Sequence, residues 1–264
     1  MNLFGIIGRK IIDKLDYYGG VIGLTVYSLR ELFRPHSSNQ NFLVYQNVVK
    51  QVYFTSYQAI RSLFFTSILI GISTVFILFA RFPGIVPKNV ISDIFVLVIF
   101  REVMPLIVIV IVIARSVSAI AVEIGNMSVN KEFDILVSMG VDPLFFLTLP
   151  RILGMVASFI ILIIFASFFI LVLSPLFLVL LYDIDAGEII NHIFKSVKIS
   201  DIVMVLVKGI VCGLFMPSIA SYFGFKTYSR NLVPVAVTKS IMVSLSFGII
   251  TSLCISLIFY LFVF

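Results

Sequence analysis

Long apolar runs, separated by short segments that hold most of the charged residues, make up most of this chain. A helix rises about 1.5 Å per residue, so about 20 apolar residues cross the roughly 30 Å hydrocarbon layer of a membrane. Five runs of about this length or more carry few or no charges, and they cover residues 62–80, 94–114, 152–182, 202–225 and 240–264. The pattern predicts an all-α integral membrane protein with five transmembrane helices in one membrane domain, residues 62–264.

The third run is longer than one perpendicular span needs. Residues 152–182 contain no charged side chain. We therefore expect a helix that tilts or extends beyond the bilayer, with Pro175 as a kink or an end point.

The first 61 residues have a different pattern. Residues 17–29 are apolar but form a short run with three glycines and charged residues on both sides. Such a run is too short to cross a membrane. We predict that it and the more polar segment 41–60 form interfacial helices on the membrane surface, the alternative for 17–29 being a sixth, distorted span. No cleavable signal peptide is expected, because the first 16 residues hold charges around short apolar pairs and no long apolar core.

The composition is that of a chain dissolved in lipid. Hydrophobic residues make up 61% of the chain and charged residues only 12%, with a mean hydropathy of +1.18. The net charge of +6 is scattered between apolar blocks, which favours basic loops beside anionic lipid over a nucleic acid partner. With a cytoplasmic N-terminus, thirteen Lys and Arg residues fall on the inner side and four on the outer side. This asymmetry predicts a multi-pass protein with its C-terminus on the opposite side of the membrane.

Motifs for catalysis are absent from the sequence. It has no G-x-x-x-x-G-K-[ST] loop for nucleotide phosphates, no H-E-x-x-H pair and no cysteine spacing suited to a metal. We therefore expect no catalytic residue, no metal site and no cofactor. Any energy for work on a substrate would then come from another protein.

Two adjacent charged residues, Arg101 and Glu102, interrupt the second run. An unpaired charge inside a bilayer costs about 3 kcal/mol or more, so such residues persist only beside partners or a watery cavity. Neighbouring residues of a helix point about 100° apart, so the two do not form one flat patch. One interpretation is a headgroup-proximal site in a lipid-binding cavity. The other is an interfacial pair whose side chains extend to water.

Small residues recur at helical spacing in two places. One set is Ala114, Ser118, Ala121 and Gly125, and the other is Ser240, Ser244, Gly248, Ser252 and Ser256. Small faces let helices approach closely. The second set drifts about 40° around the helix at each step, so we expect it to serve one oblique crossing. The alternative is a serine-rich span with no special partner.

Residues 101–151 carry a specific resemblance to a known family. In order, they contain Arg101-Glu102, Pro105, Arg115, Ser118-Ala119, Glu123, Gly125, Met127, Met139-Gly140-Val141-Asp142-Pro143 and Pro150-Arg151. This order and spacing closely resemble the MlaE (YrbE-like) permeases, the membrane subunits of ABC transporters associated with mammalian-cell-entry (MCE) domain proteins. The resemblance implies a homodimeric permease that moves phospholipid or a related lipid between membranes. It also implies a cytoplasmic ATPase subunit, an MCE-domain protein on the far side, and a bacterial inner membrane, although the inner envelope of a plastid fits as well.

Residues 126–143 form the polar, charged segment between the second and third runs. One helical face carries an apolar stripe of Phe133, Leu136, Val137 and Gly140. Asn130 is placed to cap the helix, and Gly140 with Pro143 ends it. A short amphipathic cytoplasmic helix of this kind is what a coupling helix needs to dock in an ATPase. The candidate contacts are Lys131, Glu132, Phe133, Asp134, Leu136, Met139, Gly140, Asp142 and Pro143. The alternative is a simple connector on the membrane surface.

Lys131 departs from the family, whose members carry Glu at this position. A sign reversal at an interface costs affinity when the partner charge is unchanged. We therefore predict an acidic or neutral ATPase residue opposite Lys131, unless the position lies at the rim of the contact, where single charges contribute little.

Two other functions stay open on the sequence alone. A secondary transporter driven by an ion gradient would need several paired carboxylates or histidines deep in the spans, and only Glu102 and Glu123 qualify. A membrane scaffold without transport would need neither the charges in the spans nor the coupling segment.

Overall fold

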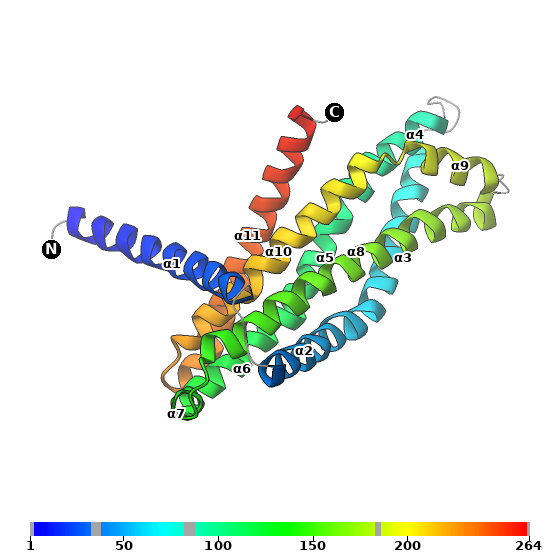
Figure 1. Ribbon diagram of the computed structural model, residues 1–264. Coiled ribbons are helices and arrows are strands. Elements are labelled where there is room, and N and C mark those ends of the chain that lie inside the picture. Colours follow the sequence, from blue (N-terminus) through cyan, green and yellow to red (C-terminus); the bar gives the residue numbers. More distant parts are fainter. Residues whose placement is uncertain (1–2, 33–37, 82–87, 183–185, 263–264) are drawn as a thin grey trace. The chain divides into compact units, whose positions relative to one another are not determined.

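The computed structural model describes residues 3–32, 38–81, 88–182 and 186–262, and every regular element in them is a helix (Figure 1). The long α-helices are α1 (Leu3–Leu32), α3 (Gln58–Arg81), α8 (Pro143–Tyr182), α10 (Ile199–Phe225) and α11 (Val233–Phe262). The shorter ones are α2 (Ser38–Val52), α4 (Lys88–Phe95), α5 (Met104–Val112), α6 (Ser118–Val129), α7 (Glu132–Ser138) and α9 (Ala186–Ser196). Three π-helical segments, Tyr53–Tyr57, Val96–Val103 and Ile113–Val117, and one 3-10 turn, Arg230–Leu232, complete the list.

Four helices among the described residues are long and apolar enough to cross a membrane. They are Ser92–Val129, Pro143–Leu173, Ile199–Phe225 and Arg230–Phe262. Each contains most of one predicted run, the second to the fifth, and the two final residues of the fifth run lie outside the described part. The first predicted run, 62–80, falls within α3, which is a continuous helix but is not one of these four. The count of five spans therefore stays a prediction.

Helix α8 does not end at Pro175. It continues to Tyr182, so of the two outcomes expected for Pro175 the end point is wrong. The same helix begins at Pro143, nine residues before the predicted run, because Pro fits the first turn of a helix, where its missing N–H has no partner to lose.

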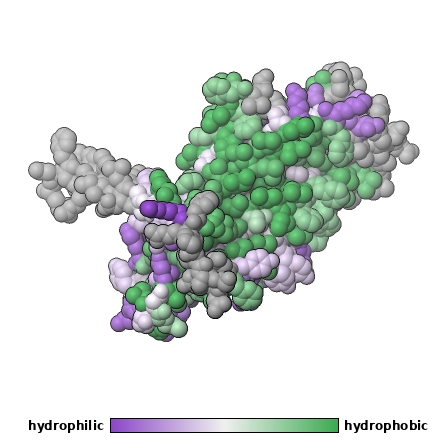
Figure 2. Space-filling model, in the orientation of Figure 1, coloured by the Kyte–Doolittle hydropathy of each residue, from purple (hydrophilic) through white to green (hydrophobic). Residues whose placement is uncertain are grey.

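Many side chains on the outer faces of these helices are apolar and exposed, as in a protein surrounded by lipid (Figure 2). Examples are Phe65 and Leu69 of α3, Phe168 of α8, and Leu257 of α11, each more than half exposed. A water-soluble protein rarely exposes apolar residues in such density. The surface therefore agrees with the apolar runs in indicating a membrane protein.

The helices form two compact units. The first contains residues 1–51, 116–155 and 213–244, and the second contains residues 52–115, 156–212 and 245–264.

In the first unit, α1 packs closely on the C-terminal part of α10. A Cβ atom on Gly20 would lie 2.3 Å from Cε2 of Tyr222, so this contact requires glycine. The ring of Tyr17 stacks on Phe223 with centroids 5.4 Å apart, and burial raises the pKa of the Tyr17 hydroxyl. Helix α1 thus has a protein-facing side, and its predicted interfacial location stays a prediction.

In the second unit, α10 and α8 are also in close contact. A Cβ atom on Gly209 would lie 2.5 Å from Cδ1 of Ile163. This close approach brings the N-terminal half of α10 into the interior of the unit, where Asp201 and Lys208 are both 0% exposed.

Candidate functional site

A cluster of charged and hydroxyl side chains lies inside the second unit, among the π-helical segment Val96–Val103, α10 and α11. Its charged members are Arg101, Glu102, Asp201 and Lys208. They carry two positive and two negative charges, so the cluster is neutral when all four are ionised.

Arg101 pairs with Asp201 near the start of α10. Its Nε lies 2.9 Å from Oδ1 of Asp201, and Arg101 is only 8% exposed. The other carboxylate oxygen of Asp201 accepts a hydrogen bond of 2.9 Å from the backbone N–H of Lys198, just before the helix. This is the side-chain half of a capping box, so Asp201 both stabilises the first turn of α10 and neutralises Arg101.

Glu102 pairs with Lys208, two turns further along α10. The Nζ of Lys208 lies 3.0 Å from Oε2 of Glu102 and donates a second hydrogen bond, of 2.8 Å, to the backbone carbonyl of Arg101. A buried ammonium is stable only when its donors are matched in this way.

Pro105 explains why the carbonyl of Arg101 accepts a side-chain donor. In an α-helix this carbonyl would bond to the N–H four residues later, and proline has none. The backbone is π-helical over Val96–Val103, and the N–H of Met104 bonds back to Ile99, five residues earlier. Single π-helical turns within α-helices are frequent at functional sites. Pro105 thus offers no N–H to the carbonyl of Arg101, and the Nζ of Lys208 donates to that carbonyl.

Helix α11 completes the cluster around Glu102. The hydroxyl of Ser256 donates to Oε2 of Glu102 at 2.9 Å, and the hydroxyl of Tyr260 donates to Oε1 at 3.4 Å. The Tyr260 ring also lies 5.9 Å from the Arg101 guanidinium, within range of a cation–π contact. Three segments distant in sequence therefore meet at one carboxylate.

The exposure of the four charges differs. The side chain of Glu102 is 26% exposed, whereas those of Arg101, Asp201 and Lys208 are 9% exposed or less. Arg101 does not extend to water, which disagrees with an interfacial pair. The geometry agrees with the expectation that charges in a span have partners, and it leaves Glu102 as the charge that another molecule can reach.

The sequence signalled only part of this cluster. Lys208 is a lone charge in the fourth run, whereas Asp201 lies just before that run and does not interrupt it. A usable signal was present, because residues seven apart lie on the same face of a helix. Asp201 and Lys208 carry the charges opposite to those of Arg101 and Glu102, so one pair can neutralise the other.

A second ion pair lies in the first unit and joins two residues of the family-like stretch. Nη2 of Arg151 lies 2.9 Å from Oε1 of Glu123, and Nη1 donates to the carbonyl of Leu147 at 2.6 Å. Glu123 was a candidate for an ion-coupling carboxylate. Its pairing with Arg151 gives it an evident role in joining α6 to α8.

The candidate coupling segment folds as a short helix between two turns. Helix α7 covers Glu132–Ser138, and Gly140 follows it with a φ of 73°. The N–H of Val141 bonds to the carbonyl of Leu136, and that of Gly140 to Val137. This is a Schellman motif, which requires glycine at the left-handed position. The predicted end at Gly140 is confirmed, and α8 then begins at Pro143.

The start of this helix differs from the prediction. Asn130 does not cap it, because its side-chain amide donates to Glu132 instead, at 3.1 Å. The residue before the helix is Lys131, which adopts a left-handed conformation with a φ of 58° and supplies no side-chain cap. Lys131 therefore belongs to the turn rather than to the helical face, and its side chain is exposed.

The faces of α7 also differ from the predicted apolar stripe. The ring of Phe133 lies 4.9 Å from that of Phe225 at the end of α10, so Phe133 is directed toward its own chain. Leu136 lines a pocket beside Asp142. Of the predicted stripe, Val137 is exposed, at 62%, and the apolar side chains of Ile135 and Met139 beside it are 57% and 72% exposed.

The remaining candidate contacts differ in exposure. Glu132 and Pro143 are half-buried, Asp134 is exposed, and Asp142 is exposed and accepts a hydrogen bond from the Tyr27 hydroxyl.

The small residues occupy different environments. Ala121, Gly125 and all five members of the α11 row (Ser240, Ser244, Gly248, Ser252 and Ser256) are buried, whereas Ala114 is exposed and Ser118 is half-buried. A Cβ atom on Gly125 would meet Val233 at 3.5 Å, an ordinary contact. Ser256 does more than pack, since it binds Glu102.

Comparison with known proteins agrees with these features. Residues 48–258 match the family model described as Permease MlaE. The chain is 22% identical over 259 residues to a "Probable ABC transporter permease protein" of Rickettsia bellii, covering 96% of this chain and 98% of that protein. A Rickettsia prowazekii protein of the same description is 23% identical over 212 residues, covering 78% and 82% of the two chains. "Protein TRIGALACTOSYLDIACYLGLYCEROL 1, chloroplastic" of Arabidopsis thaliana is 25% identical over 185 residues, covering 69% of this chain and 52% of that protein.

Proposed function

The chain belongs to the MlaE permease family, and we propose that it is the permease subunit of an ABC transporter that moves phospholipid or a related lipid between membranes. Its role is to provide the path for the lipid, while ATP hydrolysis takes place in a separate subunit. The observation that carries this proposal is the polar cluster around Glu102, built among apolar helices by residues of three separate segments.

A phospholipid has a polar headgroup and apolar chains, so its path needs polar groups inside an apolar wall. Glu102 is the exposed edge of the cluster, with the hydroxyls of Ser256 and Tyr260 beside it. These groups can exchange hydrogen bonds with a headgroup, while Lys208 and Arg101 hold the cluster in place from the buried side. This arrangement supports Arg101 and Glu102 as residues of the lipid path.

The partners follow from the family. The permease works as a homodimer in a bacterial inner membrane, with two cytoplasmic ATPase subunits and an MCE-domain protein on the far side. The turn at Lys131 and the exposed side chains of α7 form the ATPase contact, with Ile135 and Val137 joining Met139 and the other contacts expected from the sequence. The Schellman turn at Gly140 fixes the direction in which α8 leaves this contact.

The test is lipid transfer by the permease reconstituted with its ATPase. Glu102→Arg places a third cation beside Arg101 and Lys208, and we expect it to abolish transfer while the protein still inserts and binds its ATPase. Glu102→Gln keeps the size of the side chain and removes its charge, so transfer should fall several-fold. Asp93→Arg is the matched control, because Asp93 is an exposed acid of α4 outside the cluster.

Full lipid transfer by both Glu102 variants would show that the cluster is not part of the lipid path. An ion-gradient-driven transporter, the second candidate, would instead move its substrate without the ATPase and stop when an ionophore collapses the gradient. A scaffold would give no transfer under either condition.

A further inference from the structure

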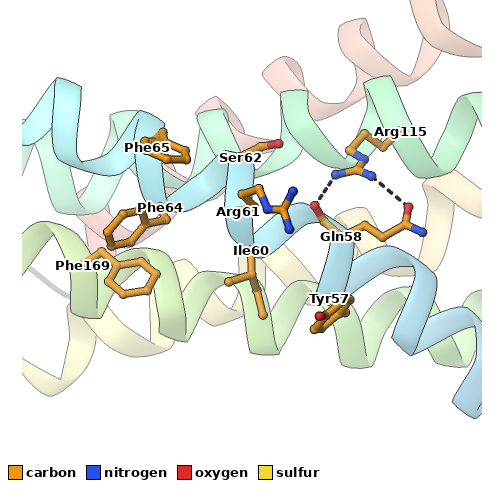
Figure 3. A pocket seen from close by; sticks show the side chains of 9 residues that line it. All are labelled: Tyr57, Gln58, Ile60, Arg61, Ser62, Phe64, Phe65, Arg115 and Phe169. Carbon is orange, nitrogen blue, oxygen red and sulfur yellow. Dashed lines mark hydrogen bonds between the residues drawn. The ribbon is translucent and has the colours of Figure 1, made fainter.

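The second unit contains a separate pocket of about 670 Å³ that shares no lining residue with the polar cluster (Figure 3). It lies among α3, the π-helical segment Ile113–Val117 and α8. Pockets of several hundred Å³ are large enough for a small ligand or part of a lipid. The residues that carry its chemistry are Gln58, Arg61, Phe64, Phe65, Arg115 and Phe169.

The polar part of this pocket is positively charged. Arg61 and Arg115 both line it, and no acidic residue does. Arg115 is held in place by Gln58, since its Nη2 donates to Oε1 at 2.8 Å and its Nη1 donates to the backbone carbonyl. Arg61 is exposed, and among the described residues no carboxylate pairs with it. Two guanidinium groups in a pocket whose lining contains no acidic residue make a site that attracts an anion.

The other part of the pocket is aromatic. The ring of Phe64 lies 5.4 Å from that of Phe65 and 5.1 Å from that of Phe169. Figure 3 shows these rings beside one another and the two guanidinium groups at the other part of the pocket. A small inorganic anion would use only the arginines, whereas a lipid would use both parts.

The place of the arginines in the sequence indicates their depth in the membrane. Arg61 directly precedes the apolar run 62–80, and Arg115 directly follows the run 94–114. Arginine at the end of an apolar helix lies at the level of lipid headgroups. Phe64 and Phe65 are about one helical turn further along α3, which places their rings at the level of the acyl chains.

We propose that this pocket binds an anionic phospholipid, with its phosphate on Arg61 and Arg115 and an acyl chain along the phenylalanine rings. Guanidinium groups bind phosphate oxygens in a bidentate manner. The positive lining offers no partner for the ammonium of a zwitterionic headgroup, so phosphatidylglycerol should bind better than phosphatidylcholine. This proposal concerns binding alone and does not depend on transport.

The experiment measures lipid binding to the purified full-length protein by native mass spectrometry, with phosphatidylglycerol and phosphatidylcholine of identical chains. We expect Arg61→Gln to weaken phosphatidylglycerol binding about tenfold, the effect of losing one charge-assisted contact. Arg61→Lys keeps the charge but loses the bidentate contact, so it should bind phosphatidylglycerol more tightly than Arg61→Gln and less tightly than the unaltered protein. Arg230→Gln, an exposed arginine outside the pocket, is the control and should bind like the unaltered protein.

Two further measurements test the aromatic and the positively charged parts of the pocket separately. Phe65→Ala should weaken phosphatidylglycerol binding, and inorganic phosphate at the same concentration should not compete with the lipid. Equal binding of the two lipids, or unchanged binding by Arg61→Gln, would overturn the proposal. Full competition by inorganic phosphate would show an anion site without a lipid site and would overturn it too.

Discussion

Replacing Lys208 by methionine should destabilise the protein strongly, because it removes the ammonium that neutralises Glu102. Methionine is close to lysine in length, so the change leaves little cavity. Lys208 is 0% exposed and donates to both Glu102 and the carbonyl of Arg101. Breaking a buried ion pair by removing one partner costs about 3–5 kcal/mol.

The expected cost lies at the lower end of that range. The side chain of Glu102 is 26% exposed, so water solvates part of its charge after Lys208 is lost. The hydroxyl of Ser256 also continues to donate to it. We therefore expect a loss of about 3 kcal/mol in the free energy of unfolding.

A double-mutant cycle tests the pairing itself. Glu102→Gln alone leaves the buried ammonium with a neutral acceptor and should cost about 2 kcal/mol. When Lys208→Met is combined with it, no buried charge is left unmatched, so the double variant should be less destabilised than the sum of the two by about 2 kcal/mol.

The assay is reversible unfolding in mixed micelles, followed by helical circular dichroism as the denaturing detergent increases. Lys239→Met, which changes an exposed lysine of α11, is the control and should shift stability by no more than about 0.5 kcal/mol. If the effects of the two cluster variants were additive, Lys208 and Glu102 would not be energetically coupled, and the two side chains would not form a stabilising ion pair.

Two other predictions concern the orientation of the chain in the membrane and its contact with the ATPase. A reporter active only outside the cytoplasm should be active when fused after Phe264 and silent at Met127. Thirteen Lys and Arg residues fall on the side predicted to be cytoplasmic and four on the other side. The reverse reporter pattern would overturn the orientation. Lys131→Glu should weaken binding to the native ATPase and strengthen binding to the ATPase of a typical family member, measured by co-purification. Equal binding to both would place Lys131 at the rim of the contact and leave the exposed side chains of α7 as its anchors.

The sequence by itself determined the class of protein and most of the helices. Apolar runs of about 20 residues leave little choice, because in lipid the backbone must satisfy its own hydrogen bonds and a helix does so within one segment. The turn at Gly140 was also predictable, since the left-handed residue that ends a helix is a local requirement and glycine meets it most readily. Arg101 and Glu102 stood out because charges within a span are costly.

Tertiary structure alone decided what those charges do. Glu102 meets a lysine 106 residues away and a serine 154 residues away, and no local pattern encodes which helices lie side by side. The same holds for α7, where Phe133 packs on Phe225 while Ile135 and Val137 are exposed. Periodicity identifies the faces of a helix, but which face is covered depends on the helices that pack against it.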